Sequence, residues 1–291
     1  CCSTHAVLKM RRMVIVYILS DPVMAFPRLT AKVETEEPAA RLAVLIDADN
    51  AQAAVIEPIL AEIARFGEAT VKRIYGDFTS SSSSSWKKVL QKYAIKPVQQ
   101  FAYSTGKNAT DSSLIIDAMD LLYTRKFDGF CLVTSDSDFT GLATRLREEG
   151  LTVLGFGEDK TPDAFRSACH RFILTEVLRS DAINNEEPAL LAKTSHPEAE
   201  PSAPKASKEI TPKLPTQFLL TALEQSGDES GWSHLGTFGS YLTKIKPDFD
   251  ARAFGFKKLS ELVKSRVDLF LTEERVPAGQ QNKQLYLKRK N

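Results

Sequence analysis

The amino-acid sequence predicts an α/β protein: a doubly wound, three-layer parallel sheet followed by a small winged-helix domain. Between residues 42 and 178, five short apolar runs alternate with segments in which apolar residues recur every three or four positions. Strands that alternate with helices of this length form a parallel sheet with right-handed crossovers. Near the C-terminus, three helical segments and two strand-like runs follow a proline-rich stretch, which predicts the winged helix.

The elements of the sheet follow from these runs in order. Strands are expected at 42–46, 69–75, 96–101, 129–133 and 151–156. Helices are expected between them at 54–66, 86–93, 111–123 and 139–149. In the first helix Ile56, Ile59 and Ile63 share one face, which is typical of a helix that packs on a sheet. Gly150 follows the last helix at the position where glycine commonly provides the C-cap.

The C-terminal segment has shorter elements. Helices are expected at 218–223, 235–245 and 254–263, and a two-stranded wing at 269–272 and 284–288. The stretch 181–215 contains six prolines and no apolar periodicity, which predicts a disordered linker. The predicted organisation is therefore an N-terminal extension (1–40, disordered or from an over-extended reading frame that truly starts at Met24), the α/β domain (41–180), the linker (181–215) and the winged-helix domain (216–291).

Composition and charge limit the class of protein. Hydrophobic residues make up 43% and charged residues 26% of the chain, as in ordered globular proteins. The net charge is +1, but residues 205–291 hold 15 Lys or Arg against 10 Asp or Glu. A basic segment beside an acidic one suits an enzyme that holds a polyanion, although a solvated surface without a partner would give the same count.

The cysteines and the hydropathy bear on where in the cell the protein is located. The four cysteines have no zinc-site spacing, and Cys131 lies in an apolar strand, so we expect reduced thiols and a cytoplasmic protein. No stretch approaches the ~20 apolar residues that a membrane span needs, and we expect no membrane contact.

Three acidic motifs stand where the sheet would bring them together. They are Asp47-Ala48-Asp49-Asn50 after the first strand, Lys107-Asn108-Ala109-Thr110-Asp111 at a helix start, and Ser135-Asp136-Ser137-Asp138 after the fourth strand. Ligands of open parallel sheets bind beyond the carboxyl ends of the strands. Carboxylates gathered in one crevice repel each other, so such a cluster usually holds a divalent metal. Ligands that are all oxygen favour Mg²⁺ or Mn²⁺ over zinc.

The acids of these motifs have different expected roles. Asp47, at the end of the first strand, is expected to be a metal ligand rather than a strand-end cap. Asp136 is expected to be a ligand, and Asp138 either contributes to the site or caps the next helix, where Asp is favoured. Asp111 is expected to face the crevice while a preceding residue caps its helix. Asp49 is expected to be a turn residue.

Further residues near the motifs have weaker signals. Asn50 is expected to hold a water or a phosphate oxygen, and Lys107 to contact a phosphate as a point charge. Asp117 and Asp120 are expected to form an exposed face of their helix. His234, like His170, is expected to be structural.

In the C-terminal domain we expect basic side chains to contact the phosphates of a polyanion and most aromatic side chains, Trp232 among them, to fill the core. The basic candidates are Lys246, Arg252, Lys257 and Lys258.

The motif set resembles the NYN domain, a branch of the PIN-like ribonucleases, over residues 42–178. The tail, with Trp232-Ser233-His234-Leu235-Gly236, Lys246-Pro247-Asp248-Phe249-Asp250 and Gly255-Phe256-Lys257-Lys258-Leu259, is similar to an OST-HTH or LOTUS domain. The resemblance implies a Mg²⁺- or Mn²⁺-dependent endoribonuclease that acts on single-stranded or structured RNA. It also implies that Asp47, Asp111, Asp136 and Asp138 are the catalytic and metal-binding residues.

Two other functions stay open at this point. An RNA-binding scaffold with a weak or inactive acidic site would lack affinity for Mn²⁺. A phosphatase for small phosphate esters could use Asp47-Ala48-Asp49 as an aspartyl-phosphate motif, but the basic winged-helix tail would then have no purpose.

Overall fold

The computed structural model of the chain describes residues 38–79, 84–101, 109–179, 214–276 and 282–290. The predicted N-terminal extension up to residue 37, the linker from 180 to 213 and Lys107 lie outside the described residues. The two folded regions, 38–179 and 214–290, are described separately below.

Residues 38–179 form the predicted doubly wound α/β domain. Six parallel strands have the order β3-β2-β1-β4-β5-β6. Their bounds are β1 Arg41–Asp47, β2 Glu68–Gly76, β3 Lys96–Gln99, β4 Gly129–Val133, β5 Thr152–Gly157 and β6 Arg171–Leu174. The chain builds outward from β1 to β3 and then returns to place β4 on the other side of β1. The topological switch point therefore lies between β1 and β4, where such sheets bind their ligands.

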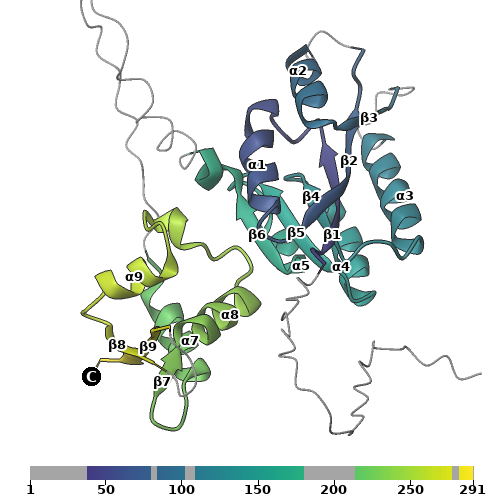
Figure 1. Cartoon of the computed structure of the whole chain (residues 1–291). Helices are drawn as coiled ribbons and strands as arrows, with labels where there is room; N and C mark the ends of the chain where they lie inside the picture. Colours follow the sequence, from purple (N-terminus) through teal and green to yellow (C-terminus); the bar gives the residue numbers. More distant parts are fainter. Residues whose placement is uncertain (1–37, 80–83, 102–108, 180–213, 277–281, 291) are drawn as a thin grey trace, which may run out of the picture. The chain divides into compact units, whose positions relative to one another are not determined.

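Helices cover both faces of this sheet (Figure 1). The helices are α1 Ile56–Ile63, α2 Ser84–Tyr93, α3 Ala109–Tyr123, α4 Thr140–Glu148 and α5 Asp163–Ala168, with short 3-10 helices η1 Ala53–Val55 and η3 Ser137–Phe139. Because side chains alternate along a strand, Ala43 and Leu45 of β1 pack with α3, α4 and α5, whereas Val44 and Ile46 pack with α1 and α2. Burial on both faces explains why β1 is a continuous apolar run.

Three details of this domain differ from the sequence prediction. The helix α5, Asp163–Ala168, was not predicted. β6 was not predicted: it has only four residues and leads directly into a helical turn at 175–179. β3 ends at Gln99 rather than at 101. The C-cap of α4 is Glu149, and the predicted capping residue Gly150 follows it with a φ of 80°, in the left-handed conformation that favours glycine at a helix end.

Residues 214–290 form a small α/β domain around its own core. It contains α7 Thr216–Ser226, β7 Trp232–His234, α8 Leu235–Ile245, η4 Ala251–Phe254, α9 Leu259–Ser265, β8 Phe270–Arg275 and β9 Gln284–Arg289. The core includes Leu219, Phe238, Leu242, Leu262 and Leu287, all buried.

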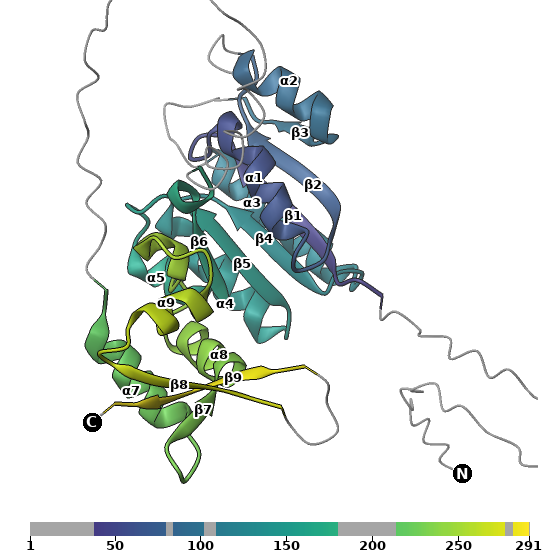
Figure 2. The same ribbon diagram turned by 60° about the vertical axis from the view of Figure 1, so that its left-hand side comes forward.

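This domain corrects the predicted wing and third helix. The antiparallel sheet has three strands in the order β7-β9-β8, rather than two (Figure 2). The third helix is split, because Gly255 adopts a φ of 85° after η4 and a regular helix begins only at Leu259. Among the described residues, no helix has the length and apolar character needed to cross a membrane.

Candidate functional site

The end of β1 holds a buried carboxylate. Asp47 is fully buried and accepts three hydrogen bonds. The side-chain amide of Asn50 and the hydroxyl of Thr134 each donate to Oδ2 at 2.8 Å, and the backbone N–H of Asp49 donates to Oδ1 at 3.0 Å. Burial raises the pKa of Asp47, while these three hydrogen bonds act to lower it. The site therefore contains a buried acid that is fixed in position by its neighbours.

The end of β4 supplies the next two acids. Oγ1 of Thr134 accepts a hydrogen bond from the backbone N–H of Asp136 at 3.1 Å, and Oδ1 of Asp136 accepts one from the N–H of Asp138 at 2.9 Å. Asp136 is therefore the N-cap of η3, and Asp138 lies in its first turn with an exposed side chain. The structure decides the alternative left open by the sequence: the capping residue is Asp136.

The first turn of α3 brings a third carboxylate to the same place. One carboxylate oxygen from each of Asp111, Asp136 and Asp138 lies within 4.8 Å of the other two, and we call these residues the acidic trio. The pKa of Asp111 is raised to about 6, first by partial burial and then by repulsion from Asp47 and from the other two acids of the trio. A divalent cation bound between these carboxylates would relieve their mutual repulsion.

The donor set of the trio fits Mg²⁺ or Mn²⁺. All three candidate ligands are carboxylate oxygens, which hard cations of this class prefer. Asp47 is not a member of the group of described residues whose oxygens meet this distance criterion. Its carboxylate is already held by donors from Asn50 and Thr134. The sequence-based assignment of Asp47 as a direct ligand stays a prediction.

The remaining residues of the acidic motifs have local roles. Asn50 donates to Asp47, so its described contact is with the buried acid, and its predicted contact with a water or phosphate stays a prediction. Asp49 is exposed and contributes its backbone N–H to the turn after β1, as a turn residue would.

A second polar cluster, which the sequence prediction missed, supports α3 from β2. The carboxylate of Asp117 accepts hydrogen bonds from the guanidinium of Arg73 and from the hydroxyl of Tyr75. Burial and the neighbouring Asp117 raise the pKa of Tyr75 far above its usual value, so the phenol keeps its proton. Asp117 was expected on an exposed helix face together with Asp120; only Asp120 is exposed. The cluster connects the helix that carries Asp111 to a strand.

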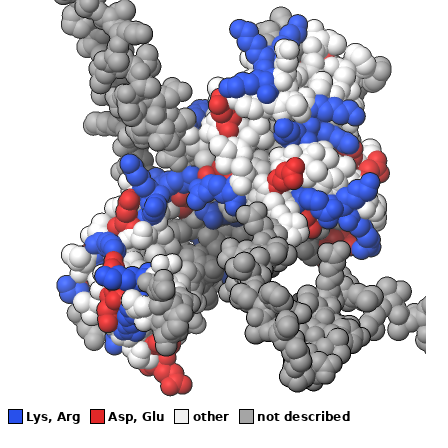
Figure 3. All heavy atoms as spheres, in the orientation of Figure 1, with Lys and Arg blue, Asp and Glu red and all other residues white. Residues whose placement is uncertain are grey.

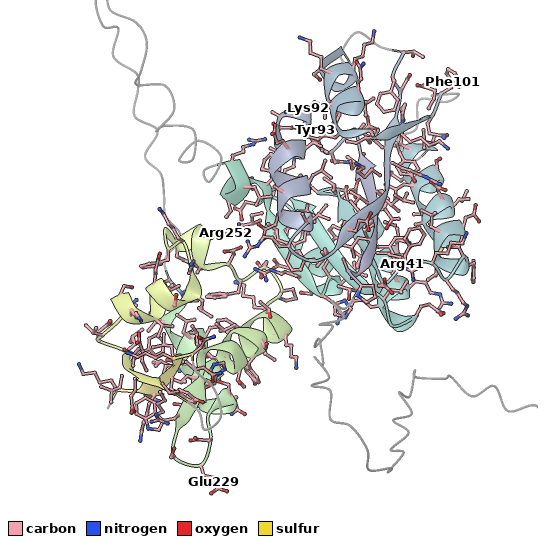
Figure 4. All side chains as sticks on the ribbon, in the orientation of Figure 1. Arg41, Lys92, Tyr93, Phe101, Glu229 and Arg252 are labelled. Carbon is pink, nitrogen blue, oxygen red and sulfur yellow. The ribbon has the colours of Figure 1, made fainter. Side chains whose placement is uncertain are left out.

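The predicted phosphate-binding residues of the C-terminal domain fall into two groups. Lys246, Lys257 and Lys258 are exposed. Arg252, labelled in Figure 4, lies in η4 and donates hydrogen bonds of 2.7–3.1 Å to both carboxylate oxygens of Asp250. This ion pair neutralises Arg252, which weakens its case as a phosphate ligand. On the face of this domain visible in Figure 3, basic and acidic side chains are interspersed.

Comparison with known proteins gives the family of each domain. Residues 41–177 match the NYN domain family and residues 211–281 match the OST-HTH/LOTUS domain family. The comparison with curated proteins found no match.

Two solved structures are similar to parts of the chain. The solution structure of an uncharacterized protein of Nitrosomonas europaea is 49% identical, covers 33% of this chain and 93% of its own, and has a TM-score of 0.27. The crystal structure of a protein of unknown function from Vibrio parahaemolyticus is 16% identical, covers 47% of this chain and 93% of its own, and has a TM-score of 0.40. The family matches, together with the fold and the acidic motifs, identify this chain as a protein with an NYN domain at 41–177 and an OST-HTH/LOTUS domain at 211–281.

Proposed function

We propose that this protein is a Mg²⁺- or Mn²⁺-dependent endoribonuclease whose OST-HTH/LOTUS domain binds the RNA substrate. The NYN family is a family of PIN-like nucleases, and OST-HTH/LOTUS domains bind RNA. The observation that carries the proposal is the acidic trio at the switch point of the sheet, where three carboxylate oxygens lie within 4.8 Å of each other. Of the other predicted residues, Lys107 keeps its proposed role as a phosphate contact.

In this proposal the acidic trio binds the cation, and Thr134 and Asp47 support the trio. Asp111, Asp136 and Asp138 would hold the cation. When bound, the cation supplies charge neutralisation at the phosphate and lowers the pKa of a water. Thr134 orients Asp136 through the N–H at 3.1 Å and fixes Asp47 behind the trio. The negative charge of Asp47 adds to the field that attracts the cation, and direct coordination of the cation by Asp47 stays part of the proposal.

The geometry of Asp47 argues against the phosphatase hypothesis. An aspartyl-phosphate mechanism requires a carboxylate that can approach a phosphorus atom. Asp47 is fully buried and accepts three hydrogen bonds. A carboxylate in this position serves better as a fixed negative charge than as a nucleophile.

The association of the two domains in one chain favours a macromolecular substrate. RNA bound by the C-terminal domain has a high effective concentration at the catalytic domain. The exposed Lys246, Lys257 and Lys258 are the proposed phosphate contacts of that domain. An RNA substrate also fits the expected cytoplasmic location.

Cleavage of a labelled circular RNA tests the proposal, because only internal hydrolysis opens a circle. We expect cleavage with Mn²⁺ or Mg²⁺, none with EDTA, and a loss of at least 100-fold for Asp136→Asn and for Asp111→Asn. Asp120→Asn, which changes an exposed acid on the same helix α3, is the matched control and should cleave normally. RNA binding without cleavage in either metal would instead support the scaffold hypothesis.

A further inference from the structure

The three-stranded sheet of the C-terminal domain has one face outside the core. Ser233 and Leu287 are paired in register and buried, so they mark the inner face. Because side chains alternate, their neighbours project from the opposite face. Register places His234 beside Tyr286 and Trp232 beside Lys288 on this outer face, and β8 adds Arg275.

Aromatic rings and a guanidinium gather on that outer face. The guanidinium carbon of Arg275 lies 4.3 Å from the ring centroid of Trp232 and 5.0 Å from that of Tyr286. The His234 ring lies 5.4 Å from the Tyr286 ring, at an interplanar angle of 61°. All of these side chains are partly exposed. We call Trp232, His234, Arg275 and Tyr286 the aromatic face.

The aromatic face has no role in the core of the domain. The apolar cluster that includes Phe238, Phe249 and Leu287 does not include Trp232 or Tyr286. The sequence prediction that Trp232 fills the core is therefore wrong. The indole of Trp232 lies outside the core and next to a guanidinium. A large, partly exposed aromatic ring of this kind can bind a planar group by stacking.

The chemistry of this face identifies its occupant. Bases of single-stranded RNA stack on aromatic side chains and on guanidinium planes, whereas bases within a duplex are already stacked on each other. Lys288 lies beside Trp232 on the outer face and is partly exposed, so its ammonium group can contact a phosphate. Glu273 pairs with Arg275 at 2.8 Å and holds the guanidinium near the rings.

We propose that the outer face of the β7-β9-β8 sheet, centred on Trp232, Tyr286 and Arg275, is a base-stacking surface for single-stranded RNA. The proposal rests on the proposed RNA binding of this domain and specifies where and in which form RNA binds. Trp232 and Tyr286 stack on bases, the guanidinium plane of Arg275 stacks on a base, and Lys288 contacts the backbone. The exposed Lys246, after α8, and Lys257 and Lys258, before α9, provide a separate phosphate contact.

Tryptophan fluorescence can report this contact directly, because the chain has only two tryptophans. Trp86 belongs to the core of the NYN domain, so Trp86→Phe in the full chain leaves Trp232 as the single emitter. We expect oligouridine or oligoadenosine, added in EDTA to prevent cleavage, to quench this emission at saturation. An unchanged emission upon binding, which anisotropy of a labelled RNA would establish, overturns the proposal.

Affinity measurements on substituted full-length protein provide the second test. Trp232→Leu and Tyr286→Leu should each weaken the binding of single-stranded RNA by about 10-fold or more, whereas Trp232→Phe should keep most of it. Arg266→Gln, which removes a charge paired with Asp268 away from this face, is the matched control. Circular dichroism and the thermal midpoint show whether each variant is folded.

The outcomes separate this inference from the proposed function. If Trp232→Leu and Tyr286→Leu bind normally while Lys257→Gln combined with Lys258→Gln does not, the domain binds RNA elsewhere and the inference fails alone. Equal affinity for an RNA duplex of the same length also overturns the single-strand assignment. If the unsubstituted protein binds no RNA at all, the proposed function fails together with it.

Discussion

The hydroxyl of Thr134 donates a hydrogen bond of 2.8 Å to Oδ2 of Asp47, although 87 positions separate the two residues. Thr134 follows the last residue of β4, and Asp47 is the last residue of β1. This bond therefore joins the ends of the two strands at the switch point of the sheet. It also makes Thr134 the link between the buried acid and the acidic trio, because the same oxygen accepts the N–H of Asp136.

Replacing Thr134 by valine should destabilise the NYN domain by about 1–3 kcal/mol, because the buried Asp47 carboxylate and the N–H of Asp136 lose a partner while the volume is kept. Urea unfolding monitored by circular dichroism measures the change. Thr144→Val, at an exposed position of α4, is the control and should leave the unfolding midpoint almost unchanged. Equal midpoints for the two variants would contradict this account.

The metal-free protein should lose stability as the pH rises from about 4 to about 6. The pKa of Asp111 is raised from 3.8 to about 6 in the folded state, so folding favours its protonated form. The stabilising contribution is complete below the unfolded pKa and is lost as the pH rises through the folded pKa. Thermal unfolding in EDTA at several pH values measures it.

In Asp111→Asn this pH dependence should become smaller, and the variant should be more stable than the unsubstituted protein at pH 8. Mn²⁺ at pH 8 should raise the thermal midpoint of the unsubstituted protein and leave that of Asp111→Asn nearly unchanged. A parallel pH profile for both proteins would show that repulsion in the trio is not the cause.

Replacing Asp117 by asparagine should destabilise the domain by about 1–3 kcal/mol, since Arg73 and Tyr75 then lose a charged partner in a partly buried cluster. It should also slow RNA cleavage, because α3 carries both Asp117 and the trio residue Asp111. Asp120→Asn is the control on the same helix. If Asp117→Asn keeps full stability but loses activity, Asp117 acts in the reaction and not by holding the helix.

Two glycine substitutions should have effects of opposite sign. A Cβ at Gly157 would lie 2.6 Å from the backbone oxygen of Thr134, so Gly157→Ala should displace the β4 end and lower both stability and Mn²⁺ affinity.

Gly141 lies in α4, and a Cβ there has no neighbour within 4 Å. Gly141→Ala should therefore stabilise the domain by about 0.5–1 kcal/mol. Differential scanning fluorimetry with and without Mn²⁺ resolves the two cases.

The sequence predicted those parts of the fold that a local apolar pattern determines. β4 has the predicted bounds, because a strand buried on both faces is an unbroken apolar run. α8 also has its predicted bounds, 235–245. The short strands β6 and β7 were missed because four and three residues are too few to show a period, and pairing with neighbouring strands defines them.

The positions of Asp47, Asp136 and Asp138 were predictable because they follow strand ends, and that of Asp111 because it opens a helix, but the hydrogen-bond partners of the site were not predictable. Asp117 pairs with Arg73 across 44 positions, and only the folded order of β2 and α3 brings the two together. Thr134 carries no motif signal beyond its position before the third acidic motif. Trp232 was assigned to a core on its hydrophobicity, and its side of the sheet depends on a strand register that the sequence does not show.

The acidic site is assembled from three separate segments, so it exists only in a completed domain. During synthesis, Asp47 leaves the ribosome long before the residues of β4, and the trio is incomplete until residue 138 has been added. A nascent or truncated chain that ends before β4 therefore cannot form the cation site. If the proposed hydrolysis takes place at this site, only molecules that have folded can carry it out.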